Sequence, residues 1–484
     1  MTEHFYRYRS TKAILSDFRE LENQEIFFSE TEKLNDPMEG FKDLFWVGDI
    51  IVWKNLLRHY ILCLLQSATY CFVAGDKFDP GAINNIVFWV PNTLPDAPIR
   101  DIYKNVSNKF LGEPITKKFL SFVSNKDAPI RRNELTSYLR SLHGFAVEIA
   151  IKEFRIRGLF PFQSNIKKSW KNDSLTRNFL KMMKGVSDVG NSKHPSENVA
   201  ETIFSISEAT LAQAALINEY NTPDREKKAP FMFWASKFPA AYVAALDRLV
   251  HRDWYVACFT KTAKNHSMWS TYADGHRGVC LMFKAEINSN GHQALTLERI
   301  VGAHGSKNGP TGYSKGNVLH EFQAVQYTGN YPAIDFFRSL GSISQQHMND
   351  FWYKGDDGSF SKCKDAVYAD AESWRNGYWQ TFNESALYKT PEWAHEEEYR
   401  LIVHSGFDLK ESGSRRLKYR FEDLTGIVFG ARTEMKDKLE IMRIIDEKCA
   451  ITKRENFRFY EIRYLHTESK FQLCSLDLIK IRHA

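Results

Sequence analysis

Three consecutive carboxylates at positions 396–398, followed closely by Arg400, are the residues of this chain best suited to chemistry. If Glu396–Val403 is a strand, its two-residue period places Glu396, Glu398 and Arg400 on one face. The intervening aromatic and aliphatic residues then face a core. Two carboxylates beside a cation can exchange protons or stabilise a developing positive charge, although a solvated acidic surface has the same pattern.

The elements that position these residues are predicted by hydrophobic periodicity. The first forty residues indicate a strand at 5–8, a helix and a strand at 26–28. Ile14, Phe18 and Leu21 have the spacing of one helical stripe. Helical periodicity dominates four later stretches: 50–72, 130–157, 197–220 and 238–251. Strand character returns at 254–259, 278–283, 322–327, 399–404 and 426–430, followed by a helix at 436–448 and a hairpin of 457–464 with 470–476.

This order of elements predicts an α+β fold interrupted by a helical insertion. Residues 1–45 form the first part of a catalytic-like core, and residues 46–250 form a helical insertion subdomain. Residues 251–484 supply the remainder of the core, with the C-terminal hairpin. A length of 484 residues suits this division into domains.

Composition narrows the class of protein. With 43% hydrophobic and 26% charged residues the chain is that of a folded globular protein, and a net charge of +6 is weak evidence for nucleic-acid binding. The seven cysteines form no CxxC pair, so neither a zinc ribbon nor a disulfide framework is indicated. The N-terminus lacks an apolar signal core, and the most apolar window, 50–74, carries Lys54, Arg58 and His59. We therefore expect a cytoplasmic protein with no membrane span.

Five separated pieces occur in a distinctive order. They are Phe5–Ser10; Ile26–Ser29 with Asn35–Glu39; Met268–Cys280; Trp393–Arg400; and Ile427–Arg432. This ordered set resembles a widespread bacterial family known as domain of unknown function 2971, over roughly residues 1–45 and 250–480.

The same motifs are remotely similar to the ADP-ribosyltransferase fold, especially its branch of DNA- and RNA-modifying toxins. The similarity rests on an aromatic-basic-aromatic first strand, Tyr6-Arg7-Tyr8, and on Glu-x-Glu late in the chain. It implies a split β-sheet core, NAD as co-substrate, no metal, and a nucleic acid or protein as acceptor. Proteins of that branch often have a histidine in the first motif, where this chain has Tyr6-Arg7-Tyr8.

The resemblance also implies catalytic roles. Breaking the nicotinamide–ribose bond creates an oxocarbenium-like centre, which a buried carboxylate stabilises. Glu398 is the candidate for this role, and Glu396 for taking a proton from the acceptor. Arg7 would hold the pyrophosphate by bidentate hydrogen bonds, and Ser29 would orient Glu398. Arg7 and Glu398 would then line one pocket.

Further ligand-binding candidates are Trp269 and Tyr272, which could sandwich nicotinamide or adenine, and Tyr8, Asn35 and His276. Each of these candidates has a structural alternative. Trp269 and Tyr272, three residues apart, suit a helical core; His276 suits a loop; and Asn35 begins a strong turn signal. Arg7 could form an ion pair with Glu396 or Glu398, and Arg400 could neutralise its acidic neighbours.

Three functional hypotheses follow. The leading one is a NAD-consuming transferase, a bacterial toxin or anti-phage defence protein, whose insertion recognises the target or binds a regulatory partner. The second is a metal-dependent nuclease or phosphoesterase, with Asp36, Glu39, Glu396 and Glu398 around Mg²⁺ near Lys389. The third is a non-catalytic interaction protein on the same fold.

Overall fold

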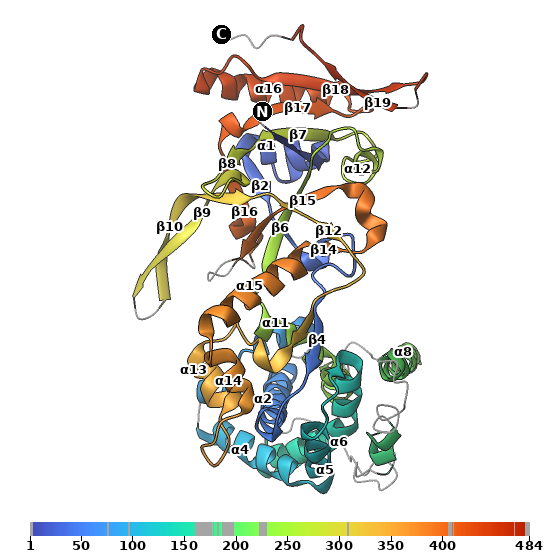
Figure 1. Ribbon diagram of the computed structural model, residues 1–484, viewed down its shortest axis with the longest axis vertical. Helices are drawn as coiled ribbons and strands as arrows, with labels where there is room; N and C mark the ends of the chain where they lie inside the picture. The colour runs from blue at the N-terminus through green and yellow to red at the C-terminus, as the bar shows by residue number, and fades with distance from the viewer. Residues whose placement is uncertain are drawn as a thin grey trace. The chain divides into compact units, whose positions relative to one another are not determined.

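A computed structural model of the chain shows a mixed α+β protein that divides into two compact units (Figure 1). It describes residues 3–74, 77–94, 97–159, 177, 179–181, 183–185, 198–221, 230–306, 309–404, 409, 411–468 and 470–479. The first unit comprises Met1–Phe41, Asp253–Tyr331 and Asn383–Ala484, and the second comprises Lys42–Arg252 and Pro332–Phe382. Residues 332–382, which the sequence analysis assigns to the core, therefore belong to the helical unit.

The main sheet of the first unit has nine strands in its described part, in the order β11-β15-β6-β1-β7-β17-β18-β19, with β3 also paired to β6. The strands are β1 (His4–Arg9), β3 (Ser29–Glu30), β6 (Trp254–Thr260), β7 (Val279–Lys284), β11 (Gln323–Ala324), β15 (Glu398–His404), β17 (Leu424–Phe429), β18 (Arg458–Leu465) and β19 (Lys470–Ser475). Among the described pairs, β17 and β18 run parallel and the others antiparallel. A sheet of this size differs from the expected pair of small split sheets.

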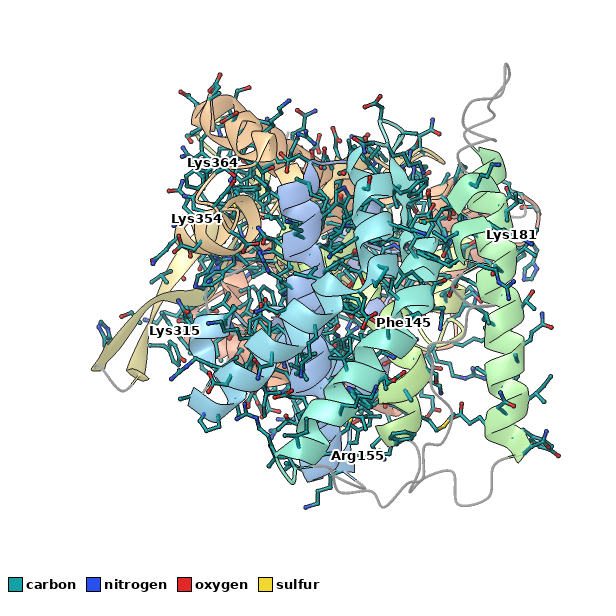
Figure 2. All side chains as sticks on the ribbon, turned by 90° about the horizontal axis from the view of Figure 1, so that it is seen from below. Phe145, Arg155, Lys181, Lys315, Lys354 and Lys364 are labelled. Carbon is teal, nitrogen blue, oxygen red and sulfur yellow. The ribbon has the colours of Figure 1, made fainter. Side chains whose placement is uncertain are left out.

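A second sheet, with five strands among the described residues, has the order β10-β9-β16-β2, with β8 paired to β9. Its strands are β2 (Glu25–Phe27), β8 (Glu286–Ile287), β9 (Gln293–Ser306), β10 (Gly309–Glu321) and β16 (Arg416–Tyr419). The long β9–β10 hairpin runs out from the rest of this unit as a ribbon that carries Lys315 (Figures 1 and 2). A short parallel pair, β12 (Gln326–Tyr327) and β14 (Tyr388–Lys389), completes the described strands of the unit.

Short helical segments and one long helix accompany these sheets. They are η1 (Ala13–Asp17), α1 (Glu20–Asn23), η2 (Thr31–Lys33), α12 (His266–Thr271), η9 (Pro391–Glu396), η10 (Ser412–Arg415), η11 (Phe421–Asp423) and α16 (Met435–Thr452). The predicted helix with Ile14, Phe18 and Leu21 in one stripe is interrupted, because Arg19 has a left-handed backbone with φ of 49°. Ile14 and Leu21 are nevertheless buried, while Phe18 is exposed.

Strand β15 is covered on both faces. It pairs with β6 in a register that places Glu398 opposite Thr260 and Arg400 opposite Cys258. Leu401 and Val403 enter the apolar core, as predicted. Glu398 and Arg400, on the other face, are also buried, so their charges must be met by partners from the protein.

The second unit is mainly helical. Its helices are α2 (Ile50–Ala74), η4 (Pro80–Ala82), α3 (Ile83–Ile86), η5 (Pro91–Thr93), α4 (Ala97–Gly112), α5 (Pro114–Ser124), α6 (Arg132–Ile156), α8 (Asn198–Asn221), η6 (Phe233–Lys237), α10 (Phe238–Ala245), α11 (Asp247–Val250), η7 (Phe336–Arg338), α13 (Gln345–His347), η8 (Met348–Tyr353), α14 (Lys362–Tyr368) and the start of α15 (Ala371–Leu387). A small sheet joins β13 (Ala333–Asp335), β4 (Asp43–Trp46) and β5 (Ile130–Arg131). The four predicted helical stretches correspond to α2, α6, α8 and the pair α10–α11.

The helices of this unit close around one large apolar core. Phe145 of α6 is buried among them, whereas Arg155 near the end of the same helix is exposed (Figure 2). None of the helices in the described ranges is long and apolar enough to cross a membrane.

Candidate functional site

A cluster of five charged side chains is buried at the start of β15. Glu398 and Arg400 come from the strand, Lys389 from β14, Glu396 from the end of η9, and Glu39 from the turn after η2. None of the five side chains is more than 4% exposed. We call this group the charged cluster.

The chain between β14 and β15 brings the two carboxylates together. Pro391 begins the 3₁₀ helix η9, and Glu397 ends it with a left-handed backbone at φ of 46°. Lys389 Nζ donates to Glu396 Oε2 at 2.6 Å and to Glu398 Oε2 at 3.0 Å. The expectation that Glu396 and Glu398 share a strand face is therefore corrected, since Glu396 precedes the strand and reaches Lys389 through a turn.

Arg400 completes the cluster. Its Nε donates to Glu398 Oε1 at 2.9 Å and its Nη2 to Glu398 Oε2 at 3.2 Å, which is a bidentate pair. Arg400 also forms an ion pair with Glu39, and its Nη1 donates to the carbonyl of Ala386 at 2.6 Å. The prediction that Arg400 neutralises its acidic neighbours is confirmed.

The surroundings of Glu398 and Glu39 shift the pKa values of these two carboxyl groups in opposite directions. Burial alone would raise the pKa of Glu398, but Arg400 and Lys389 outweigh it and lower that pKa to about 2. For Glu39 burial dominates, and its pKa is raised despite Arg400 and Lys389. Burial would lower the pKa of Lys389, but the surrounding carboxylates raise it above the ordinary range. Glu398 is thus held ionised, and Glu39 accepts a proton more readily than an ordinary glutamate.

Two tyrosines complete the polar contacts. The Tyr272 hydroxyl donates to Glu396 Oε1 at 2.7 Å, and the backbone N–H of Glu398 donates to the Tyr327 hydroxyl oxygen at 2.8 Å. Burial and the nearby Glu396 raise the pKa of Tyr272, so its hydroxyl stays protonated and remains a donor. The Glu396 carboxylate and the Glu398 backbone are therefore each held in position by a tyrosine hydroxyl.

A cavity of about 330 Å³ opens beside the charged cluster. Six of the residues predicted from sequence line it: Arg7, Tyr8, Ser29, Asn35, Tyr272 and Glu398. Glu39 and Lys389, which the sequence analysis named only for the metal hypothesis, also line it, and so do Arg9, Lys33 and Cys258, which it did not select. Arg7 and Glu398, far apart in the sequence, thus line one cavity as expected.

Arg7 is 5% exposed and has an unusual set of partners. Its Nη2 donates to the Phe27 carbonyl at 2.9 Å and its Nη1 to the Cys258 carbonyl at 3.4 Å. Its Nε has no hydrogen-bond partner among the described residues. Burial, with a smaller contribution from Arg9, lowers the pKa of Arg7 to about 10, so it stays charged. No ion pair of Arg7 with Glu396 or Glu398 is present in the described part of the chain, which corrects that alternative.

Trp269 does not line the cavity, so the expected sandwich with Tyr272 is not formed. The indole is fully buried, donates to the Ala263 carbonyl at 2.7 Å, and meets the Tyr8 ring edge-on at 5.1 Å. The following loop lies tightly against β1, because a Cβ on Gly278 would come within 2.2 Å of the Arg9 carbonyl oxygen. Trp269 is therefore a core residue, as its helical alternative predicted.

Two other candidates also differ from expectation. His276 lies in the same loop at φ of 70°, packs against the Phe471 ring at 5.6 Å and is not among the residues that line the cavity. Ser29 lines the cavity, but the Glu398 carboxylate receives its hydrogen bonds from Lys389, Arg400 and the Cys258 thiol within the described residues. The proposed orienting role belongs to these residues instead.

The sequence analysis named Lys389 and Glu39 only for a metal site, and a local signal for ion pairing exists for one of them. Lys389 precedes the acidic run in the same segment, and a lysine so close to three carboxylates is a natural partner if the segment folds back. Glu39 follows a turn motif and has no pattern that links it to position 400. Its place in the cluster depends on the fold.

The metal hypothesis requires four acidic residues, and three of them do converge. Glu39, Glu396 and Glu398 surround Lys389, whose Nζ lies 3.8, 2.6 and 3.0 Å from their carboxylate oxygens. Asp36 instead accepts the Met38 backbone N–H at 2.8 Å within the turn. Within the described ranges, no group of three or more His, Cys, Asp or Glu residues is arranged to hold a metal ion.

The fold and site define a class: a mixed α+β protein with a buried, ion-paired acidic cluster beside a cavity lined by cations. Residues 268–401 match the model of a family described as protein of unknown function, DUF2971. The match includes the Met268–Cys280 and Trp393–Arg400 pieces and covers a minor part of the chain. No curated protein and no solved structure matches the chain, so the similarity to ADP-ribosyltransferases gains no support from these comparisons.

Proposed function

We propose that this protein is a NAD-dependent, ADP-ribosyltransferase-like effector that modifies a nucleic acid or a protein. The observation that carries the proposal is the buried Arg7, whose Nε has no partner among the described residues, in a cavity whose wall also holds the ionised Glu398. A buried guanidinium N–H without a partner is costly, and a ligand oxygen would satisfy it.

The charges around the cavity favour an anionic ligand. Four cations line it, but Arg9 is paired with Glu20, Lys33 with Glu30, and Lys389 with the charged cluster. Arg7 has no carboxylate partner in the described part of the chain and is therefore the one best placed for a phosphate. The volume is at the lower end of the range for ligand pockets, so it suits one half of a dinucleotide.

In this proposal Glu398 stabilises positive charge that develops on the ribose, because it remains ionised inside a water-poor site. Glu396, fixed by Tyr272 and Lys389, receives the proton of the acceptor. Glu39, with its raised pKa, is an additional proton-exchanging group that the sequence analysis did not place in this role.

The convergence of Glu39, Glu396 and Glu398 also supports the metal-dependent phosphoesterase as a second candidate. The position among the three carboxylates is taken by the Lys389 ammonium, and Arg400 binds Glu39 and Glu398 from the other direction. A divalent ion would have to displace both cations, so we favour the transferase.

The decisive experiment measures nicotinamide release from NAD and mass increase of lysate components, with and without chelator. We expect both signals from the wild type, insensitive to chelator, and loss of both in Arg7→Ala. The matched control is Glu397→Gln, an exposed neighbour that should retain activity. Wild-type protein that neither cleaves NAD nor labels any acceptor overturns the proposal, and chelator-sensitive phosphodiester cleavage would favour the second candidate.

A further inference from the structure

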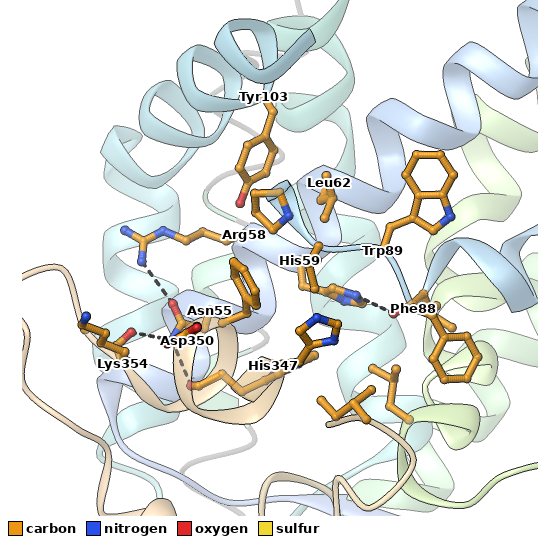
Figure 3. Close-up of a pocket in the computed structure, with 18 of the residues that line it drawn as sticks. Asn55, Arg58, His59, Leu62, Phe88, Trp89, Tyr103, His347, Asp350 and Lys354 are labelled. Atoms are coloured by element: carbon orange, nitrogen blue, oxygen red, sulfur yellow. Dashed lines mark hydrogen bonds between the residues drawn. The ribbon is translucent and has the colours of Figure 1, made fainter. Parts of the chain in front are cut away.

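The second unit contains a cavity of about 220 Å³ that the proposed function does not use. It is lined by residues of α2, the 87–91 segment, α4 and the η8 region (Figure 3). Every residue that lines it belongs to this unit. We refer to it as the ring pocket, because its walls are rich in ring side chains.

His59 forms a fixed, uncharged wall of the ring pocket. Its Nε2 lies 2.9 Å from the Val87 carbonyl (Figure 3), and its Nδ1 lies 2.9 Å from the Tyr242 hydroxyl. Because a carbonyl can only accept, Nε2 carries the hydrogen and Nδ1 accepts from Tyr242. Burial lowers the pKa of His59 to about 4, so the ring is neutral near pH 7.

Other rings extend this wall. Trp352 lies 5.0 Å from His59 between ring centroids, and His347 lies 5.9 Å from Phe351. Phe88, Trp89 and Tyr103 also line the cavity. Aromatic and imidazole side chains from several segments line the cavity, and such a lining favours a planar ligand that can stack.

Some polar side chains that line the ring pocket have hydrogen-bond partners among the described residues, and Asp350 has none. Asn55 donates to the Trp352 and Lys354 carbonyls, and Arg58 donates to both Asp356 oxygens at 2.6 Å. Asp350 lines the same cavity and is exposed, and its carboxylate has no hydrogen bond or ion pair within the described residues. An ionised carboxylate only accepts, and its two oxygens suit two parallel N–H donors.

We propose that the ring pocket binds a planar heteroaromatic ring with two adjacent N–H donors, the pattern of guanine and of pterins. The ring stacks among the aromatic walls and donates to the carboxylate of Asp350. Adenine presents one donor next to an acceptor on the corresponding edge, so it fits this carboxylate poorly. The small volume suits a single ring system, with any sugar or phosphate outside the pocket.

The test is isothermal titration of the full chain with guanosine, pterin and adenosine. Guanosine or pterin should bind saturably, and adenosine at least about tenfold more weakly, the difference expected for a charge-assisted bidentate pair. Asp350→Asn should weaken guanosine binding by about tenfold or more. Asp365→Asn, an exposed aspartate of α14 outside the pocket, is the matched control and should bind like the wild type.

Two further variants separate the ring pocket from other sites. Ile343→Phe fills the pocket and should abolish binding, with circular dichroism to confirm folding, while Glu398→Gln in the first unit should not affect guanosine. The proposal is overturned if neither guanosine nor pterin binds at millimolar concentration, or if adenosine binds equally well. It is also overturned if Asp350→Asn binds guanosine as the wild type does.

Discussion

The cavity beside the charged cluster and the ring pocket satisfy their polar groups in different ways. In the first unit the cavity borders the charged cluster, whose buried charges are paired with one another, and Arg7, which has no carboxylate partner among the described residues. In the ring pocket much of the wall is formed by uncharged rings, and His59 is bonded to a carbonyl and a hydroxyl. The first arrangement selects a ligand by charge, whereas the second selects by ring stacking and by the hydrogen bonds that one carboxylate, Asp350, accepts.

Removal of one cation from the charged cluster and one from the ring pocket tests this difference most strongly. Arg400→Met leaves Glu39 and Glu398 partly uncompensated in a buried site, and we expect a loss of about 3–5 kcal/mol in the free energy of unfolding. Arg58→Met removes a pair whose aspartate side chain is 65% exposed, and should cost less than about 1 kcal/mol. Urea unfolding measures both values, and equal losses would contradict the comparison.

The next effect is on catalysis. The charged cluster has three carboxylates and two cations, so Glu398→Gln leaves two of each and should preserve the fold. Because the charge beneath the ribose is lost, nicotinamide release should fall about a hundredfold or more. Glu396→Gln should reduce transfer to the acceptor more than NAD cleavage. Comparable loss of cleavage in both variants would contradict the separate roles.

As the pH falls, Glu398 beside the first cavity and His59 in the ring pocket should lose their contributions to stability in different pH ranges. The pKa of Glu398 is about 2 when folded against an ordinary 4.5, so its contribution is present above pH 4.5 and lost as the pH falls toward 2. The pKa of His59 falls from 6.5 to about 4, so its contribution is already lost between pH 6.5 and 4.

Urea midpoints measured across these ranges provide the check. Glu398→Gln should flatten the loss below pH 4.5, and His59→Gln should reduce the loss between pH 6.5 and 4. The reduction is partial, because burial also lowers the pKa of His143 to about 4. His143 therefore still loses its contribution over the same pH range in the His59 variant. Profiles identical to that of the wild type would show that these two groups do not control the acid response.

The smallest effect concerns salt. Raising NaCl from about 50 to 500 mM should weaken NAD binding, because a charged ligand is attracted by cations that salt screens. Guanosine, which is neutral, should change its affinity for the ring pocket by less than about twofold. Titrations at both salt concentrations test this, and a strong salt dependence for guanosine would mean that charge also governs the ring pocket.

Much of the secondary structure was predictable because its patterns are local. Helices α2, α6 and α8 follow apolar periodicity over many residues, and strands β1 and β15 have strong alternating or apolar patterns. The interruption at Arg19 and the turn at Glu397 were not predictable, since non-glycine residues rarely adopt a left-handed backbone. The assignment of residues 332–382 to the core failed because helical segments there are short, and only packing shows which core they join.

For the site, the sequence by itself determined which residue types were available: an acidic run beside Arg400, an arginine in the first strand, and aromatic residues at 269 and 272. Tertiary structure alone decided that Tyr272 contacts Glu396 while Trp269 fills the core, and that Glu39 and Lys389 join the cluster. The physical reason is that a buried charge must find its partners in space, and those partners come from segments that have no fixed separation along the chain.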